Sequence, residues 1–175
     1  MLATKNRAGS YAVLCVALAL IVLGCTPAGP RALLDGRRLL EEGKYDLAVA
    51  KLKIATTLLN TNAQAWNYFG LACHRAGQLT NAVAAYQKAL DLNRDLLEAR
   101  YNLGCVWLDL RKPDLAKAEL TSYTLRRGNA VEGWLKLGTA QLRGREVTAA
   151  EKSFREALRL YRAARQGSCQ QGFFH

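Results

Sequence analysis

The fold is decided by residues 66–86, WNYFGLACHRAGQLTNAVAAY, because elements of this stretch return along the chain at a fixed interval. The first of its two glycines, Gly70, belongs to a series of glycines that lie 34 residues apart: Gly36, Gly70, Gly104 and Gly138. Alanines keep the same interval twelve residues later, at Ala48, Ala82, Ala116 and Ala150. A fixed period of this length predicts a repeat architecture, in which each helical hairpin buries its apolar face only by stacking on its neighbours.

Within each period the apolar residues follow helical spacing. We expect eight helices, paired as four hairpins, at residues 31–42, 45–59, 63–75, 79–92, 96–110, 113–126, 130–143 and 147–164. Half of the residues are hydrophobic and only three are proline, which suits an ordered helical domain. The four hairpins follow one another without an insertion, so we expect a single domain over residues 31–165.

The units resemble tetratricopeptide repeats over residues 29–164. The residues that carry the resemblance are Trp66, Gly70, Cys73, Ala82 and Tyr86 in the second unit, and Trp134, Gly138, Ala150 and Phe154 in the fourth. In the third unit Arg100 stands where the pattern has tryptophan, and the first unit has Ala32 and Asp35 at apolar positions. The resemblance implies an all-α, right-handed α-solenoid of four tetratricopeptide helical hairpins.

The small residues suggest how each hairpin packs. We expect each glycine of a first helix to face the alanine of the second helix, which would let the two backbones approach. Larger residues, Leu52, Tyr86, Leu120 and Phe154, would then fill the space between hairpins. Tyr123 interrupts a series of alanines, Ala55, Ala89 and Ala157, so the junction between the third and fourth hairpins is expected to be wider or locally adjusted. Asn60 and Gly128 are expected to end helices in the left-handed conformation, and Asn129 with Glu132 to cap the next helix start.

The first residues indicate export. Lys5 and Arg7 precede an apolar run of thirteen residues, 11–23, which spans about 20 Å as a helix, too short for a hydrocarbon core of about 30 Å. Residues 1–24 are therefore interpreted as a secretory signal peptide. Removing them takes away two basic residues and no acidic one, which lowers the net charge from +11 to +9.

The end of this run, Val22-Leu23-Gly24-Cys25, resembles the lipobox of bacterial lipoproteins, although Val22 and Leu23 depart from its usual residues. The resemblance implies that Cys25 carries a lipid, that residues 25–30 are a short tether, and that Thr26 directs the protein to the outer membrane, facing the periplasm. An uncleaved anchor and ordinary secretion remain open.

By the same family resemblance, a peptide or another protein would lie in a concave groove lined by the first helices. Helical spacing places the following residues there: Leu33, Arg37, Leu40 and Glu41, then Asn67, Leu71, His74 and Arg75, then Tyr101, Cys105, Leu108 and Asp109, and finally Leu135, Thr139, Leu142 and Arg143. The alternative is that these residues only pack the helices together.

No residues in the sequence form a catalytic pattern. The chain has two histidines and five cysteines, without a nucleophile motif, a phosphate loop or paired metal ligands. We therefore expect no enzyme activity, no cofactor and no metal site, and no specific recognition of nucleic acid.

The last helix is basic, with Arg155, Arg159 and Arg162 on its expected exposed side. This face either binds an anionic surface, on a partner or a lipid, or is only solvated. Residues 166–175 are expected to be a flexible tail, and without a capping helix Leu158, Leu160 and Tyr161 would be partly exposed.

Two functions agree with these features. The first is an envelope-anchored scaffold for the assembly of a pilus, a secretion system or the outer membrane. The alternative is a membrane-anchored chaperone that presents a client protein to an enzyme complex, such as one that matures cytochrome c.

Overall fold

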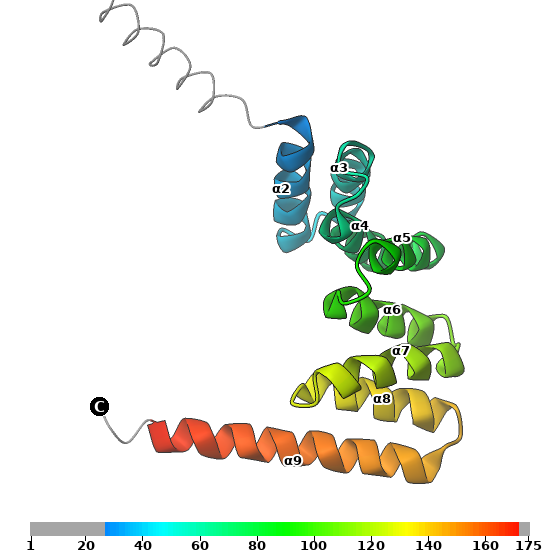
Figure 1. The fold of residues 1–175 in the computed structure, drawn as a ribbon, viewed down its shortest axis with the longest axis vertical. Coiled ribbons are helices and arrows are strands. Elements are labelled where there is room, and N and C mark those ends of the chain that lie inside the picture. The colour runs from blue at the N-terminus through cyan, green and yellow to red at the C-terminus, as the bar shows by residue number, and fades with distance from the viewer. Residues whose placement is uncertain (1–26, 172–175) are drawn as a thin grey trace, which may run out of the picture.

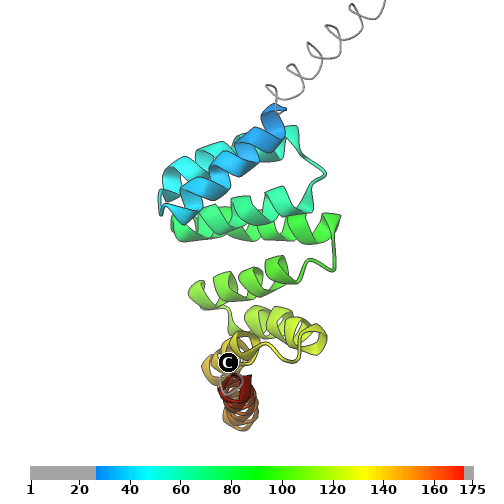
Figure 2. The same ribbon diagram turned by 90° about the vertical axis from the view of Figure 1, so that its left-hand side faces the viewer.

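The computed structural model describes residues 27–171 of the chain, so Cys25 and the expected signal peptide lie outside the described residues. Within this range the chain forms eight α-helices, which confirms the four predicted hairpins: α2 (Ala28–Glu41) with α3 (Tyr45–Leu58), α4 (Ala63–Arg75) with α5 (Leu79–Leu92), α6 (Leu97–Asp109) with α7 (Pro113–Arg126), and α8 (Val131–Arg143) with α9 (Val147–Gln171). The hairpins stack along the long axis, with α2 at one end and α9 at the other (Figures 1 and 2).

The first helices form the inner layer of the stack. In the described chain, α2 contacts α4, α4 contacts α6 and α6 contacts α8, whereas no second helix contacts another second helix. The first helices therefore lie on the shorter, inner side of the arc, and α3, α5 and α7 lie on its outer side. We call α2, α4, α6 and α8 the inner layer. Among the described residues, no helix has the length and apolar character needed to cross a membrane.

Each hairpin packs a large side chain against the periodic glycine, which corrects our expectation that glycine faces alanine. A Cβ added at Gly70 would lie 2.8 Å from the ring of Tyr86, and one at Gly138 would lie 2.6 Å from that of Phe154. Leu52 and Leu120 fill the same space over Gly36 and Gly104. These large residues therefore pack between the two helices of their own hairpin, and not only between one hairpin and the next. The alanines Ala48, Ala82, Ala116 and Ala150 are also buried, at most 2% exposed.

The turn inside each hairpin uses a left-handed residue, again every 34 residues: Gly43 (φ 72°), Gly77 (φ 76°), Arg111 (φ 56°) and Arg145 (φ 63°). The following amide donates back to the first helix, as in Lys44 N to Leu39 O at 2.9 Å and Lys112 N to Trp107 O at 2.8 Å. This is the Schellman pattern of a helix C-terminus. The residues expected to be left-handed, Asn60 and Gly128, are not among those with positive φ, so that prediction is wrong.

Asn60 and Gly128 instead supply carbonyl oxygens to the next hairpin. The indole Nε1 of Trp66 donates to Asn60 O at 2.9 Å, and that of Trp134 donates to Gly128 O at 2.8 Å. Arg100, at the equivalent position of the third unit, donates through Nη2 to Arg94 O at 3.0 Å. A guanidinium thus replaces an indole in the same hydrogen bond.

The helix ends differ from prediction at three places. Helix α2 begins at Ala28, so Pro30 and its two predecessors belong to a helix rather than to the expected tether. Helix α8 begins after Ala130 with no side-chain cap, so the cap expected from Asn129 and Glu132 does not form. Helix α9 continues to Gln171 instead of ending near residue 164, because the residues that follow Leu160 are mostly good helix formers.

Candidate interaction site on the inner layer

The predicted groove residues occupy four rows along the inner layer, each row taking one residue from each first helix. Most of them are half-buried or exposed, and Leu135 and Leu142 reach 47% and 51% exposure. Asn67 and Leu108 are the exceptions, each only 4% exposed. Asn67 accepts a hydrogen bond from Asn102 Nδ2 at 3.4 Å. The side chains of Asn67 and Leu108 therefore pack between helices and are not available to a ligand.

Side chains of neighbouring first helices bridge the inner layer. The guanidinium of Arg37 lies over the ring of Tyr68, 4.9 Å from its centroid. His74 Nε2 lies 2.7 Å from Asp109 Oδ2, which joins α4 to α6. Arg143 Nη1 donates to the carbonyl of Leu108 at 2.6 Å and joins α6 to α8. The structure therefore brings the predicted residues together in pairs across successive hairpins.

Two cavities lie at equivalent places on this surface, two hairpins apart. One has a volume of about 350 Å³, and it is lined by Arg37, Leu40, Glu41, Tyr45, Tyr68, Leu71 and Arg75. The other has a volume of about 600 Å³, and it is lined by Leu108, Asp109, Arg111, Pro113 and Arg143. Between the two cavities, at the junction of α4 and α6, the hydrogen bond between His74 and Asp109 spans the place where a third cavity would lie. The inner layer thus offers two separated recesses rather than one even groove.

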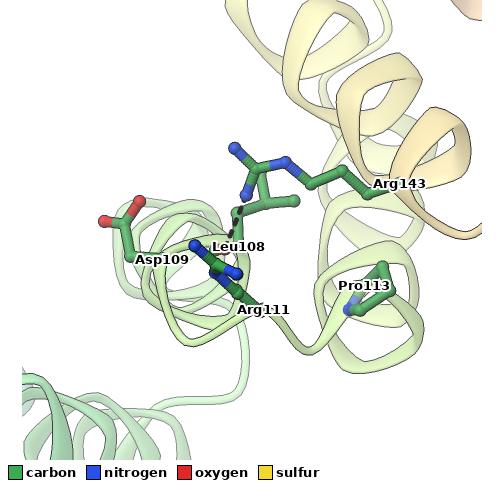
Figure 3. A pocket seen from close by; sticks show the side chains of 5 residues that line it. All are labelled: Leu108, Asp109, Arg111, Pro113 and Arg143. Carbon is green, nitrogen blue, oxygen red and sulfur yellow. Dashed lines mark hydrogen bonds between the residues drawn. The ribbon is translucent and has the colours of Figure 1, made fainter.

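The larger cavity combines two guanidinium groups without a carboxylate partner. Figure 3 shows Arg143 reaching from α8 to the Leu108 carbonyl, with the Arg111 guanidinium close by and the Asp109 carboxylate turned away from both. Asp109 is engaged by His74, and neither arginine forms an ion pair with any residue of the described range. Guanidinium groups bind carboxylates through paired hydrogen bonds, so this cavity suits an acidic side chain.

The thiols near the inner layer are poor nucleophiles. Burial raises the pKa of Cys73 to about 11, and burial likewise raises the pKa of Cys105 above its ordinary value. Both groups are therefore protonated at neutral pH, whereas the thiolate is the form that attacks substrates and binds metals. In residues 27–171, no group of three histidine, cysteine or acidic side chains is arranged to hold a metal ion. The arrangement favours binding through charge and apolar contact.

Comparison with known proteins agrees with this geometry. Two family models match, a TPR repeat model over residues 70–108 and a tetratricopeptide repeat model over residues 101–166. The chain is a tetratricopeptide repeat protein. Among curated protein sequences, none matches it.

Solved tetratricopeptide structures share its fold. A crystal structure of MamA matches with a TM-score of 0.75 and 23% identity, covering 79% of this chain and 81% of the other. MamA from Desulfovibrio magneticus RS-1 matches with a TM-score of 0.73 and 20% identity, covering 77% and 76%. A chain of the APC/C hetero-tetramer Cut9-Hcn1 matches with a TM-score of 0.69 and 19% identity, covering 75% of this chain and 27% of the other. At these identities the likeness shows the fold alone.

The basic residues predicted on the last helix of the tetratricopeptide array are exposed. Arg155 pairs with Glu151 at 2.6 Å, and Arg159 pairs with Glu156 at 2.6 Å. Arg162 forms no ion pair with the described residues. Because α9 and α2 lie at opposite ends of the array, this basic face lies far from α2 (Figure 1).

Four residues that line the two cavities were not predicted from the sequence: Arg111, Tyr45 and Pro113, from the turns and second helices, and Tyr68 on α4. The groove prediction includes only first-helix positions, and Tyr68 lies one residue beyond Asn67 on α4. A signal for Arg111 was present, since it lies 34 residues after Gly77 and therefore at the left-handed turn position.

Proposed function

We propose that this tetratricopeptide protein is a lipid-anchored scaffold of a bacterial envelope, which holds together protein components of an envelope machine such as a pilus, a secretion system or an outer-membrane assembly complex. Tetratricopeptide arrays bind other proteins, and the family matches support such a scaffold. The envelope location rests on the N-terminal sequence. The cavity that contains Arg111 and Arg143 carries the proposed mode of binding.

The anchor is proposed at Cys25, at the periplasmic face of the outer membrane. Helix α2 begins at Ala28, so only Thr26 and Pro27 separate it from Cys25. Two residues reach at most about 7 Å, which would keep the first hairpin against the bilayer. The array would then extend away from the membrane and offer its inner layer to proteins in the periplasm.

The anchor is tested by Cys25→Ser, with Cys15→Ser as the matched control, because Leu14 precedes Cys15 where a small residue is required. Cys25→Ser should abolish palmitate labelling, and it should either release the protein from membranes or leave it unprocessed, since stable attachment of the mature chain needs more than one acyl chain. Cys15→Ser should be labelled and fractionate as the wild type does. A Cys25→Ser protein that is processed and held in membranes like the wild type would contradict the anchor.

The partner is proposed to place acidic side chains in the two inner-layer cavities. Each cavity carries two arginines and one acid, and in the larger one that acid is already bound to His74. Apolar residues beside the arginines, such as Leu40 and Leu71 in the smaller cavity, would contact apolar side chains of the same partner protein.

This binding mode is tested by Arg143→Glu, with Lys88→Glu as a control that makes the same charge change on the exposed side of α5. Partners are captured from chemically crosslinked envelopes and identified by mass spectrometry. Arg143→Glu should lose a defined set of proteins that Lys88→Glu retains, while both variants keep wild-type helical circular dichroism. Equal recovery by the two variants would exclude this cavity as the binding site.

A further inference from the structure

The last hairpin leaves open a face that is covered in the hairpin before it. In the third hairpin, helix α8 covers Leu108 and Thr124, which are 4% and 3% exposed. The residues 34 positions later, Leu142 and Leu158, are 51% and 47% exposed. Between them lies a cavity of about 340 Å³, lined by Leu142, Val147, Ala150, Glu151, Phe154, Arg155 and Leu158. We call the apolar members of this set the end face.

Within residues 27–171 the chain does not turn back over the end face. Helix α7 ends at Arg126, and the chain then turns so that α8 lies across the third hairpin. The equivalent position in α9 is Leu160, and here the helix continues to Gln171 (Figure 1). The continued helix therefore carries the chain past the end face and adds a further exposed surface beside it.

That further surface is basic. Arg162 and Arg165 lie four and seven residues after Leu158, so helical spacing places them in line with it. Both are exposed and neither forms an ion pair within the described part of the chain. An occupant of the end face would therefore meet apolar side chains over one part of its length and positive charge over the other.

We infer that the end face receives an amphipathic helix of a partner protein, with acidic residues at the end that lies beside Arg162 and Arg165. The internal repeat indicates what such a helix presents. In the preceding junction, α8 supplies Gly133 against Tyr123 and Thr124, and places Leu137 and Ala140 in the cluster with Leu108 and Leu120. The occupant should thus carry a small residue, an apolar residue four positions later and a second small residue three positions after that.

Charge argues against a second copy of this chain as the occupant. Two end faces packed together would bring their arginine rows into one interface, where like charges without partners are costly. An acidic partner helix would instead pair with them. This surface is separate from the inner-layer cavities and from the anchor, so the inference stands or fails independently of the proposed function.

The probe is a pair of synthetic peptides that copy residues 129–144, the segment that covers the equivalent face of the third hairpin. The acidic peptide carries Asn129→Asp and Val131→Glu, and the basic peptide carries Asn129→Lys and Val131→Lys. Binding to the full chain in detergent is measured by fluorescence anisotropy. The acidic peptide should bind about fivefold more tightly than the basic one, because it complements the arginines.

Three variants locate the binding. Leu158→Glu should weaken both peptides about tenfold, since it places a charge in the apolar contact. Leu125→Glu, at a leucine of α7 that is 81% exposed, should bind both peptides as the wild type does. In a variant with Arg162→Glu and Arg165→Glu the preference for the acidic peptide should disappear. Because the same two peptides are compared on the wild type and on this variant, any difference in helicity between the peptides cancels.

Several results would overturn the inference: no binding of either peptide, equal binding by wild type and Leu158→Glu, or a dimer in sedimentation velocity that Leu158→Glu dissociates. Leu158 is half exposed, so its replacement should leave the fold intact, and circular dichroism checks this. Val147→Glu, at a residue that is 64% exposed on the same face, provides a second variant with the same expected loss.

Discussion

The ring of Tyr123 on α7 fills the space that a side chain at position 133 on α8 would need. A Cβ added to Gly133 would lie 2.6 Å from Cε1 of that ring. The same two positions hold Ala55 with Ala65, and Ala89 with Ala99, in the earlier junctions, and all four alanines are fully buried. In the third junction the pair of alanines is thus replaced by one large side chain, that of Tyr123, facing a glycine, which has no side chain. The local adjustment expected around Tyr123 is the glycine on the facing helix.

This exchange predicts strong coupling between the two positions. Gly133→Ala should destabilise the protein by about 1–3 kcal/mol through overpacking, although alanine is the better helix former. In a Tyr123→Ala background the same change should be neutral or stabilising, because it restores the alanine pair of the earlier junctions. Urea unfolding of all four proteins gives the coupling energy. Additive effects would show that the ring and the glycine do not compete for space.

A second prediction concerns the left-handed turns. Arg145 adopts φ 63°, where Gly43 and Gly77 stand in the first two hairpins. Removing its Cβ relieves a strain of about 1–2 kcal/mol, but the added freedom of the unfolded chain offsets about 0.4–1 kcal/mol. Arg145→Gly should therefore stabilise the protein by up to about 1.6 kcal/mol and raise its melting temperature. Arg145→Ala keeps the Cβ and serves as the control, which should show no gain.

A third prediction concerns thiol reactivity. Because burial raises the pKa of Cys73 to about 11, its thiolate fraction is very small at pH 8 and grows only as the pH approaches 11. Alkylation of Cys73 by iodoacetamide in the native protein should be far slower than that of glutathione, and denaturant should remove the protection. Cys105, which is only half-buried, should react faster than Cys73. Peptide mapping by mass spectrometry separates the two sites, and equal rates would contradict the burial described here.

Much of the architecture follows from the sequence because the 34-residue period repeats without an insertion. The period places each hairpin, and the helix bounds agree with the structure within a few residues at most ends. The packing partner of each glycine could not be predicted in this way. Ala48 and Leu52 lie one turn apart on α3, and the period does not determine which of them covers Gly36; in the structure it is Leu52.

The candidate site was predictable in outline and not in its contacts. The family resemblance together with helical spacing placed Arg75, Asp109 and Arg143 on the inner layer. The hydrogen bond between His74 and Asp109, which joins α4 to α6, depends on side-chain conformations that the period does not determine. The period indicates that Arg111 occupies the turn position of Gly77, but that its side chain lines the larger cavity does not follow from the period.

The last prediction concerns the hydrogen bond that closes each connection between hairpins. Trp66 Nε1 donates to Asn60 O and Trp134 Nε1 to Gly128 O, and Arg100 replaces the indole in the third unit. Trp66→Phe and Trp134→Phe remove this donor while keeping an aromatic ring, so each should destabilise the protein by about 0.5–1.5 kcal/mol. Arg100→Trp should retain the bond to Arg94 O, whereas Arg100→Leu should lose it.

Trp107→Phe is the control, because the Trp107 ring packs in the core and under Lys112, and its indole makes no hydrogen bond to the residues of the described range. Urea unfolding of the five variants separates the loss of the donor from the loss of ring area. If Trp107→Phe costs as much as Trp66→Phe and Trp134→Phe, the contribution of the indoles is packing, and the periodic hydrogen bond adds nothing measurable to stability.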